Sequence, residues 1–461
     1  MTETIQTKVL VVGGGPGGYV AAIRCGQLGL ETVLVEGDRV GGTCLIRGCI
    51  PSKALIHVAG IYEQMEAAAM RSHFGIRLKT APQIDLAETV SWKESVVDRL
   101  NTGVAALLKR AKVRTLSGYG RFSDAKTCHV ATADGEVTVN AEHVILATGS
   151  VPIELPFLPF GGKVISSTEA LSLPKLPDRL VVVGAGYIGL ELGIAFAKLG
   201  ANVTVVEAMD RILPLYDAKL IEPVLRWLET HGVEVHLQAK ATGLEMEGLG
   251  IETKAGEQLV LPADKILVTV GRKPATQGWG LEEMAIEMDG RFVKVDDRCA
   301  TSTKNVWAIG DLVGEPMLAH KASAQGEMVA EIIAGHRRHF DPVAIPAVCF
   351  TEPEIVSVGK GPVTPDTILG VFPLAANGRA LSMAAGDDGG FVRVVALKES
   401  HRIVGVQAVG QHISELSATF TQAIETGLVL EDVAGIIHAH PTLSETFHEA
   451  SLKALGHAIH V

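Results

Sequence analysis

Several features are scarce in this sequence of 461 residues, and each scarcity excludes a class of protein. Basic residues number 41 against 52 acidic ones, which gives a net charge of −11 and argues against a nucleic-acid-binding surface. Six cysteines are too few for a disulfide scaffold. We find no N-terminal signal sequence, and we expect no apolar run of the ~20 residues that a bilayer span needs. The expected location is the reducing cytoplasm.

Apolar residues and glycine, by contrast, are abundant. Hydrophobic residues make up 47% of the chain and charged residues 20%, so the chain can form sizeable cores and is not disordered. At roughly 150 residues per domain, the length predicts about three domains. The 50 glycines follow no collagen-like period, so we expect them at specific turns.

The sequence contains an internal repeat. Residues 11–36 (VVGGGPGGYVAAIRCGQLGLETVLVE) align with residues 182–207 (VVGAGYIGLELGIAFAKLGANVTVVE) at a constant offset of 171. Each copy consists of an apolar strand, a glycine-rich turn, a helix that ends at glycine, and a second apolar strand that ends at Glu36 or Glu207. This pattern predicts a βαβ unit that occurs twice.

The glycine-rich turn of the first copy has the spacing GxGxxG, formed by Gly13, Gly15 and Gly18. In this motif the first glycine permits the tight turn, the second lets the backbone approach a pyrophosphate, and the third lets helix and strand pack closely. Glu36 lies where a carboxylate would bind ribose hydroxyls. We interpret the unit as a dinucleotide site; the alternative is a glycine-rich turn in an α/β domain without a ligand.

The second copy carries the same motif in Gly184, Gly186 and Gly189. Glu207 favours NAD over NADP, because a carboxylate accepts a 2′-hydroxyl but repels a 2′-phosphate. Arg211 is a possible phosphate ligand and is the argument for NADP. Two such sites in one chain indicate two dinucleotides and electron transfer between them.

Two cysteines follow the first βαβ unit in the segment GGTCLIRGCIPSK, residues 41–53. Cys44 and Cys49 have four residues between them, a spacing at which two thiols can lie one turn apart at a helix start and form a disulfide. A helix N-terminus also stabilises a thiolate. We interpret the pair as redox-active; the alternatives are two structural cysteines or half of a zinc site, and we expect no metal.

Together these motifs resemble the class I pyridine nucleotide-disulfide oxidoreductases, and within them the branch that oxidises dihydrolipoamide. The resemblance covers nearly the whole chain. It rests on GGGPGG, GGTCLIRGCIPSK, ATGS (147–150), GAGYIG, GRKP (271–274), AIGDL (308–312), MLAHKA (317–322), FTEPE (350–354) and HAHPTLSE (438–445), in that order.

The resemblance implies an α/β fold with two Rossmann-like dinucleotide-binding domains and a C-terminal α+β dimerisation domain. The expected boundaries are 1–150 for the first part of the FAD-binding domain and 151–276 for the NAD-binding domain. Residues 277–345 are expected to return to the FAD domain, and 346–461 to form the interface domain. Proline-rich stretches at 151–160 and 172–180 suit a linker between domains.

The same resemblance implies the reacting groups. Cys44 would exchange with the dithiol substrate, and Cys49 would lie against the flavin. His440, oriented by Glu445, would be the acid–base and would reach the site of the other subunit of a homodimer. An imidazole with an ordinary pKa of about 6.5 suits thiol–disulfide exchange. His438 is the neighbour that could be mistaken for it.

Two sets of residues would hold the cofactors. Lys53 would lie near the flavin ring and pair with Glu191, Asp311 would bind the ribityl chain, and Tyr187 would cover the nicotinamide side. The FAD set is Gly13, Gly15, Gly17, Gly18, Glu36, Gly42, Thr43, Lys53, Gly120, Thr148, Gly149, Ser150, Asp311, Met317, Leu318, Ala319 and His320. The NAD set is Gly184, Gly186, Tyr187, Ile188, Gly189, Glu191, Glu207 and Gly271.

The sequence departs from the family pattern at three positions. Ile46 stands where asparagine is usual, Arg47 where a small apolar residue is common, and Phe350 where tyrosine is commoner. The implied activity is oxidation of protein-bound dihydrolipoamide with reduction of NAD⁺, in a 2-oxo-acid dehydrogenase complex that supplies lipoyl-bearing and core subunits as partners. The alternatives are another FAD-dependent disulfide reductase and a non-catalytic scaffold subunit.

Overall fold

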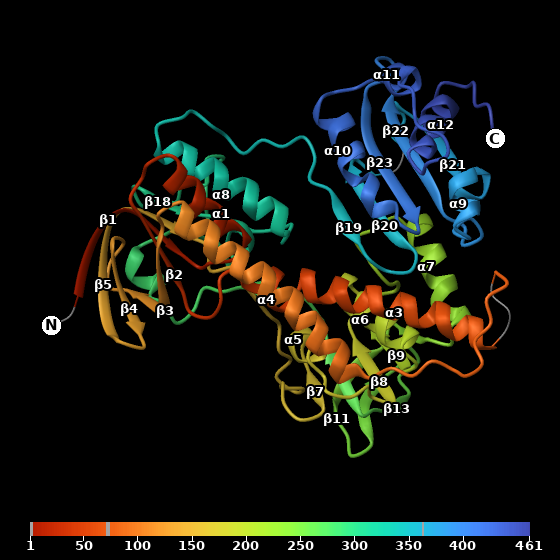
Figure 1. Cartoon of the computed structure of the whole chain (residues 1–461), viewed down its shortest axis with the longest axis horizontal. Helices are drawn as coiled ribbons and strands as arrows, with labels where there is room; N and C mark the ends of the chain where they lie inside the picture. The colour runs from red at the N-terminus through yellow and green to blue at the C-terminus, as the bar shows by residue number, and fades with distance from the viewer. Residues whose placement is uncertain (1–2, 71–73, 362–363) are drawn as a thin grey trace.

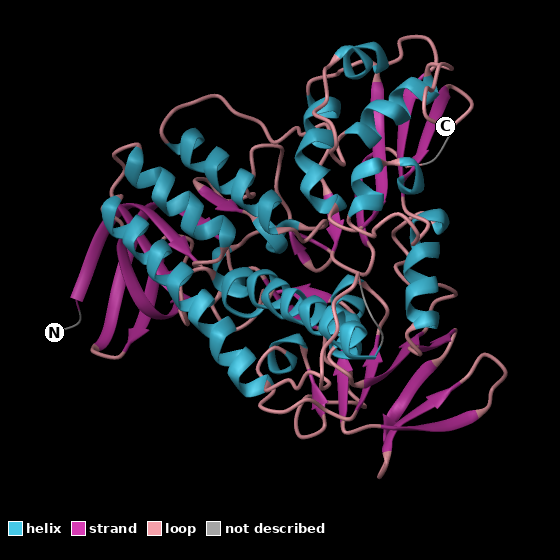
Figure 2. Ribbon diagram, turned by 45° about the vertical axis from the view of Figure 1, so that its right-hand side comes forward, coloured by secondary structure: helices cyan, strands magenta, loops and turns pink. Residues whose placement is uncertain are grey.

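The computed structural model describes residues 3–70, 74–361 and 364–461, which form three units. Figure 1 shows the first unit around β1–β5, the second around β7–β9, and the C-terminal unit around β20–β23. Figure 2 shows the strands gathered in these separate groups, with helices packed on them.

The first unit is built on a six-stranded sheet. Five strands run parallel in the order β3-β2-β1-β5-β18, and β4 joins β3 to β5 as an antiparallel meander. Helices α1 and α8 pack on each other beside it, and α4 contacts α1. Its elements are β1 (Glu3–Val12), α1 (Pro16–Gln27), β2 (Thr32–Glu36), α2 (Gly42–Arg47), α3 (Cys49–Met70), α4 (Leu86–Arg110), β3 (Arg114–Phe122), β4 (Thr127–Thr132), β5 (Gly135–Leu146), η1 (Leu281–Met284), β16 (Met288–Asp289), β17 (Phe292–Val293), β18 (Val306–Ala308), η2 (Gly310–Val313) and α8 (Ala319–Ile333).

The last strand of this sheet comes from a distant part of the chain. Strand β18 pairs in parallel with the end of β5, and Trp307 lies opposite Ile145. Both residues are buried, so the pairing is fixed by the core as well as by the ladder. The segment after the second unit therefore completes the first sheet.

The second unit repeats the parallel architecture on a smaller scale. Its five parallel strands lie in the order β10-β9-β8-β14-β7, and a three-stranded antiparallel sheet, β11-β12-β13, is attached to it. Its elements are β7 (Val164–Ile165), α5 (Ser167–Ala170), β8 (Arg179–Val183), α6 (Tyr187–Lys198), β9 (Asn202–Glu207), α7 (Ala218–Thr230), β10 (Glu234–Leu237), β11 (Lys240–Leu244), β12 (Gly248–Glu252), β13 (Gln258–Pro262) and β14 (Lys265–Val268), with β6 (Ser150–Pro152) and β15 (Arg272–Pro274) paired at its entry and exit.

The C-terminal unit is an antiparallel sheet covered by helices, with strand order β19-β20-β23-β22-β21. Helix α12 packs on β21 and β22, α10 packs on β20 and β23, and α7 of the second unit also contacts β23. Contacts on several sides explain why β22 and β23 are almost entirely buried. Its elements are β19 (Ala347–Cys349), β20 (Glu354–Gly359), β21 (Thr367–Pro373), η3 (Leu374–Ala376), α9 (Gly378–Ser382), β22 (Phe391–Leu397), β23 (Ile403–Gly410), η4 (Ile413–Leu416), α10 (Ser417–Glu425), α11 (Leu430–Gly435) and α12 (Glu445–Ala454).

The sequence repeat is also a structural repeat. Helices α1 and α6 begin and end 171 residues apart, as do the ends of β2 and β9. Gly13 and Gly184 have φ angles of 98° and 99°, a conformation that side chains disfavour. The predicted pair of βαβ units is confirmed, and with it the fold class: two α/β units with parallel sheets, followed by an α+β unit.

One stretch, Gly42–Met70, covers α2 and α3 and is long and apolar enough for a membrane span by length and composition alone, since an 18-residue window in it has a mean hydropathy of 1.3. The reason is its high content of alanine and isoleucine. A single such helix among the described residues is weak evidence, because core helices pass the same test. Here α3 packs against both α4 and α6.

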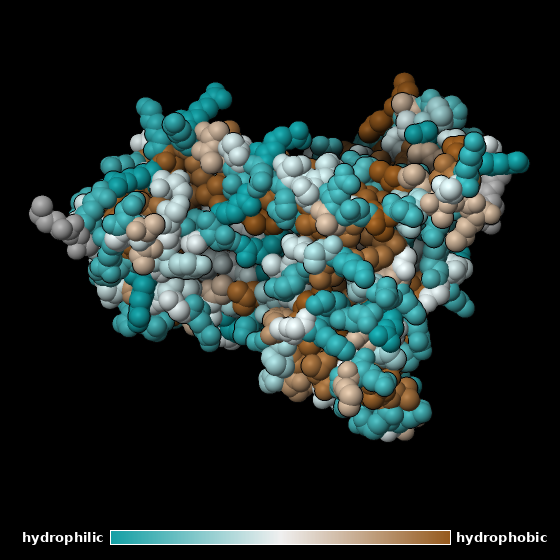
Figure 3. Space-filling model, turned by 60° about the horizontal axis from the view of Figure 1, so that its bottom comes forward, coloured by the Kyte–Doolittle hydropathy of each residue, from teal (hydrophilic) through white to brown (hydrophobic). Residues whose placement is uncertain are grey.

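Helices α3 and α4 nevertheless expose apolar side chains. The exposed residues include Ile61 and Met65 on α3 and Trp92 and Leu107 on α4. Figure 3 shows apolar residues gathered across the middle of one face of the molecule. Such patches are typical of protein–protein interfaces.

Candidate active site

A cavity of about 630 Å³ lies where the first and second units meet. Its volume falls in the range of about 300–1,000 Å³ that is usual for small-molecule sites. The wall combines the glycine loop after β1, helix α2, the start of α3, the N-terminus of α6 and the start of α8. A ligand in this cavity therefore contacts segments from both βαβ units.

The glycines of the first loop are required by close backbone packing. A Cβ on Gly13 would lie 2.3 Å from the Ala147 carbonyl oxygen, and one on Gly18 would lie 1.8 Å from the Gly13 oxygen. Gly15 is different, because the nearest atom to its Cβ position is 4.0 Å away. Its open side allows a ligand to approach the backbone at the N-terminus of α1, where a helix attracts anions. The loop thus fits the pyrophosphate of a dinucleotide.

The acidic residue at the end of β2 holds this loop. The Glu36 carboxylate accepts hydrogen bonds from the Gly14 N–H at 2.6 Å and the Asp38 N–H at 2.8 Å. Burial raises the pKa of Glu36, although the hydrogen bond from Gly14 and the charge of Arg47 oppose the rise. Tyr119 lies over Gly37 and lines the cavity beside Glu36. The motif search missed Tyr119, since it lies on β3, far from the loop in sequence.

The two cysteines line the middle of the cavity. Cys44 lies on α2, and Cys49 is the first residue of α3. Both are free thiols, joined by a side-chain hydrogen bond. This hydrogen bond, together with burial, raises the pKa of Cys44. The bond from Cys44, aided by the Lys53 ammonium, lowers the pKa of Cys49 to about 7 although burial opposes it. Of the two thiols, Cys49 is therefore the one that ionises more readily.

Lys53 and Glu191 form the expected ion pair. Lys53 Nζ lies 2.7 Å from Glu191 Oε2, and the other carboxylate oxygen accepts the Phe350 N–H at 2.9 Å. The ammonium also lies 4.3 Å from the centre of the Phe350 ring. Lys53 belongs to the first unit, Glu191 to the second and Phe350 to the C-terminal one. The three units are thus tied together beside the cysteines.

A second network crosses the cavity at the joint between the units. Ser150 Oγ donates to Asp311 Oδ2 at 2.5 Å. Arg272 Nε donates to Ser150 Oγ at 2.8 Å, and Arg272 Nη2 donates to the Ser150 carbonyl oxygen at 2.7 Å. Arg272 lines the cavity but was not predicted as a site residue, although its motif was noted. The arrangement fixes the Asp311 carboxylate at the cavity wall.

The second glycine loop matches the first. A Cβ on Gly184 would lie 2.7 Å from the Thr269 carbonyl oxygen, and one on Gly189 would lie 2.2 Å from the Gly184 oxygen. No atom lies within 4 Å of the Cβ position of Gly186, so the backbone is open there at the start of α6. This loop therefore also fits a pyrophosphate.

Glu207 takes the position that Glu36 has in the first unit. It accepts the Ala185 N–H at 2.7 Å and the Met209 N–H at 2.8 Å. Arg211 instead donates to the Pro214 carbonyl at 2.9 Å. Arg211, the residue that could bind a 2′-phosphate, thus forms a hydrogen bond within its own loop.

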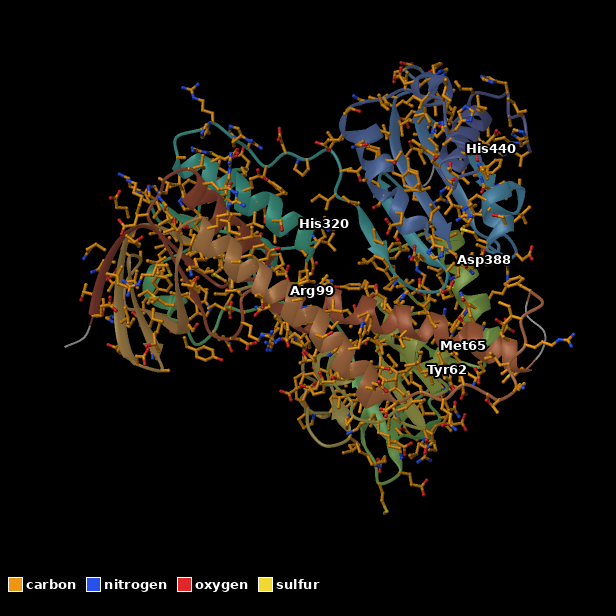
Figure 4. All side chains as sticks on the ribbon, viewed as in Figure 1. Tyr62, Met65, Arg99, His320, Asp388 and His440 are labelled. Atoms are coloured by element: carbon orange, nitrogen blue, oxygen red, sulfur yellow. The ribbon has the colours of Figure 1, made fainter. Side chains whose placement is uncertain are left out.

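His440 and Glu445 form a pair in the C-terminal unit. His440 Nδ1 lies 2.9 Å from Glu445 Oε1, and Glu445 Oε2 accepts the Thr442 N–H at 2.8 Å. Although partial burial opposes it, these hydrogen bonds lower the pKa of Glu445. The His440 side chain is 79% exposed and does not line the cavity of its own chain. Figure 4 shows it in the C-terminal unit, apart from His320 on α8.

The structure brings most, but not all, of the predicted residues to the cavity. The residues that line it are Gly13, Gly15, Gly17, Glu36, Gly42, Thr43, Cys44, Cys49, Lys53, Thr148, Gly149, Ser150, Tyr187, Ile188, Glu191, Asp311, Met317 and Ala319. Those that do not are Gly18, Gly120, Leu318, His320, Gly184, Gly186, Gly189, Glu207, Gly271, His440 and Glu445.

Three of these outlying residues have other contacts. Gly120 faces Cys128 across the β3–β4 meander, His320 bonds the Pro346 carbonyl, and the Gly271 carbonyl accepts the Ile153 N–H. Within the described residues, no group of three or more histidine, cysteine, aspartate or glutamate side chains could hold a metal ion.

The fold, the glycine loops and the cysteine pair define a two-dinucleotide disulfide oxidoreductase. Residues 7–326 match the family model of the pyridine nucleotide-disulphide oxidoreductases, and residues 345–451 match that family's dimerisation domain. The chain belongs to this family. Members use FAD and NAD(H), and the two glycine loops described above fit both cofactors.

Within this family, the chain is similar in sequence to dihydrolipoyl dehydrogenases. The chain is 57% identical to a dihydrolipoyl dehydrogenase of Pseudomonas aeruginosa over the full length of both chains. It is 46% identical to the dihydrolipoyl dehydrogenase of Geobacillus stearothermophilus, with 99% of this chain and 98% of the other covered.

Solved structures have the same fold. The crystal structure of LpdA from Mycobacterium tuberculosis aligns with a TM-score of 0.87 at 26% identity and covers 96% of this chain and 99% of that one. The HOCl-induced flavoprotein disulfide reductase RclA of Escherichia coli aligns with a TM-score of 0.83 at 25% identity and covers 95% of this chain and 98% of that one.

Proposed function

We propose that this chain oxidises protein-bound dihydrolipoamide to lipoamide and reduces NAD⁺ to NADH. The observation that supports this proposal most strongly is the pair of Cys44 on α2 and Cys49 at the start of α3. Both line a cavity that is also lined by the first glycine loop. A dithiol substrate needs an accepting disulfide, and two thiols within hydrogen-bond distance can form one. The high identity to dihydrolipoyl dehydrogenases over the full length supports this substrate.

The sulfur chemistry begins from the oxidised Cys44–Cys49 pair. A substrate thiolate attacks Cys44 Sγ, the Cys44–Cys49 bond breaks, and Cys49 leaves as a thiolate. The second substrate thiol loses its proton to His440 and attacks the substrate sulfur of the mixed disulfide. Cyclic lipoamide is released, and Cys44 leaves as a thiolate that takes up this proton to become a thiol. The substrate loses two electrons and the cysteine pair gains them. When bound, FAD supplies the route by which this electron pair reaches NAD⁺.

His440 would accept the substrate proton, and Glu445 would hold the imidazole tautomer. Because His440 is exposed and lies outside the cavity of its own chain, it would serve the cavity of the second subunit of a homodimer. The dimerisation domain at residues 345–451 supports this assembly. A carboxylate 2.9 Å from Nδ1 stabilises the imidazolium that forms.

The cavity residues would divide between the two cofactors. Glu36 has both oxygens bonded to backbone N–H groups but keeps further lone pairs for ribose hydroxyls. Lys53 and Asp311 would lie along the flavin and its ribityl chain. Glu207 would bind the NAD ribose in the same way, and Tyr187, 40% exposed at the start of α6, would cover the nicotinamide side.

The remaining assignments follow from this function. The FAD domain would comprise residues 1–150 and 277–345, the NAD domain 151–276 and the interface domain 346–461. Lipoyl-bearing and core subunits of a 2-oxo-acid dehydrogenase complex would be the partners. The cytoplasm would be the location.

An anaerobic spectral titration tests this function. Dihydrolipoamide should reduce the purified flavoprotein with a new long-wavelength band, and NAD⁺ should restore the oxidised spectrum with formation of NADH. His440→Gln should lower turnover about 10²–10⁴-fold with FAD still bound. The control His438→Gln should stay within about twofold of the unchanged enzyme. A flavin that ignores dihydrolipoamide but is reduced by NADH would refute the substrate.

A further inference from the structure

Helix α2 is short and is flanked by glycines. It spans six residues, Gly42–Arg47, and carries Cys44. Gly41 and Gly42 have φ angles of 105° and 58°, and Gly48 follows the helix with a φ of −141° and a ψ of −111°. Backbone hydrogen bonds hold the N-terminal flank, from the Gly41 N–H to the Gly14 oxygen at 2.7 Å and from the Gly42 N–H to the Arg39 oxygen at 3.4 Å. Side-chain contacts of the helix itself add to them.

The apolar side of α2 supplies one such contact. Leu45 is 8% exposed and belongs to the core beneath the first sheet. Ile46 packs against the same core and is half buried. Neither side chain carries a polar group, and apolar packing is non-directional. These contacts hold the helix against the core.

Arg47 supplies a polar contact on the other side. Its guanidinium forms an ion pair with the Asp38 carboxylate, and both side chains line the cavity. Within the described parts of the chain, this is the only ion pair that α2 makes. Asp38 is itself fixed, because its N–H donates to Glu36 at 2.8 Å. Arg47 therefore joins the cysteine-bearing helix to the turn that follows β2.

We propose that Arg47 is a positioning residue for the sulfur chemistry: through Asp38 it anchors α2 and thereby holds Cys44 in its reacting position. The inference rests on the proposed redox role of Cys44. An arginine is suited to this role, because its planar guanidinium can bond a carboxylate through two N–H groups at once. In this chain the anchor is therefore an ion pair that can be broken by substitution.

The test compares four variants of the FAD-loaded enzyme. Arg47→Met removes the charge but keeps the length of the side chain, Asp38→Asn removes the partner charge, and the double variant removes both. Arg47→Lys is the rescue variant. Arg114→Met is the control, because Arg114 pairs with Glu3 on the surface of the same unit and does not line the cavity.

Three quantities are measured for each protein. They are kcat and KM with dihydrolipoamide, the rate at which iodoacetamide alkylates Cys44 after anaerobic reduction, and the rate of FAD release. Arg47→Met should lower kcat about two- to fivefold, the range that a half-exposed ion pair supports. KM and FAD release should change less than about twofold, and alkylation of Cys44 should become faster as α2 loosens.

The coupling between the two positions decides the outcome. Asp38→Asn should reproduce the effect of Arg47→Met, the double variant should add little, and Arg47→Lys should recover most of kcat. Additive effects, or values of Arg47→Met equal to those of Arg114→Met, would overturn the proposal. Faster FAD release with unchanged alkylation would also overturn it, because Arg47 would then serve the cofactor. If the unchanged enzyme ignores dihydrolipoamide, the proposed function fails, but the alkylation rates still test the anchor.

Discussion

The ion pair between Lys53 and Glu191 should contribute far more to stability than a surface pair of the same length. The comparison pair is Arg179 and Asp264, whose nitrogen and oxygen atoms lie 2.8 Å apart against 2.7 Å for Lys53 and Glu191. The Glu191 side chain is only 5% exposed, whereas Arg179 and Asp264 are 50% and 38% exposed. Water therefore screens the attraction between Arg179 and Asp264 and can solvate either charge when its partner is removed. Water has little access to the Glu191 carboxylate, so it can do neither there.

The expected magnitudes follow from this burial. Removing one partner of a buried pair costs about 3–5 kcal/mol, because the other charge remains buried and uncompensated. Lys53 is itself 32% exposed, and without it Glu191 would still accept the hydrogen bond from the Phe350 N–H. We therefore expect Lys53→Met to lower the free energy of unfolding by a smaller amount, about 2–3 kcal/mol. Arg179→Met should cost far less, because water solvates the charge that remains.

Thermal unfolding at saturating FAD and fixed protein concentration measures the difference. Lys53→Met should lower the Tm by roughly 3–8 °C and Arg179→Met by at most about 2 °C. The double variant Lys53→Met with Glu191→Gln should recover part of the loss, since no buried charge is then left alone. Equal Tm losses for Lys53→Met and Arg179→Met, or a double variant less stable than either single one, would refute the reasoning.

Two further predictions concern the cysteines and the glycines. In the reduced enzyme the thiolate absorbance should titrate near pH 7 through Cys49 and disappear as the pH falls below that value; a midpoint above about 8.5 that Cys44→Ser does not alter would contradict the assignment. Gly18→Ala should abolish FAD retention, because its Cβ would lie 1.8 Å from the Gly13 oxygen. The control Gly60→Ala, in helix α3 with nothing within 4 Å, should retain FAD and raise stability by about 0.5–1 kcal/mol; an equal FAD content of the two proteins would contradict this account.

Local sequence was enough to predict the fold class and the family. Both depend on patterns that a few adjacent residues produce: an apolar strand, a glycine turn, a helix and a terminal acid. The repeat at an offset of 171 predicted two such units, because a turn with positive φ at Gly13 and Gly184 excludes most other residues. The stretch Gly42–Met70 shows the limit of composition, because it passes the length and hydropathy test for a membrane span although α3 packs against α4 and α6.

Contacts between distant segments could not be predicted in the same way. Arg272 reaches Ser150 across more than a hundred residues, and Tyr119 reaches the loop after β2 from another strand. Such contacts cannot be predicted from residue spacing or periodicity, because they depend on how the sheets are placed relative to one another. The GRKP segment was part of the family resemblance, but the resemblance did not predict a contact for Arg272.

The sequence by itself therefore determined which chemical groups the protein has and which backbone turns they accompany. The positions of the cysteines, the glycine loops and the terminal acids are local properties, since each depends on backbone conformations that adjacent residues allow. Only the tertiary structure decided that Lys53, Glu191 and Phe350 meet from three units, and that His440 lies outside the cavity of its own chain. These relations arise from packing between units, which minimises buried unpaired charge and exposed apolar surface over the whole molecule.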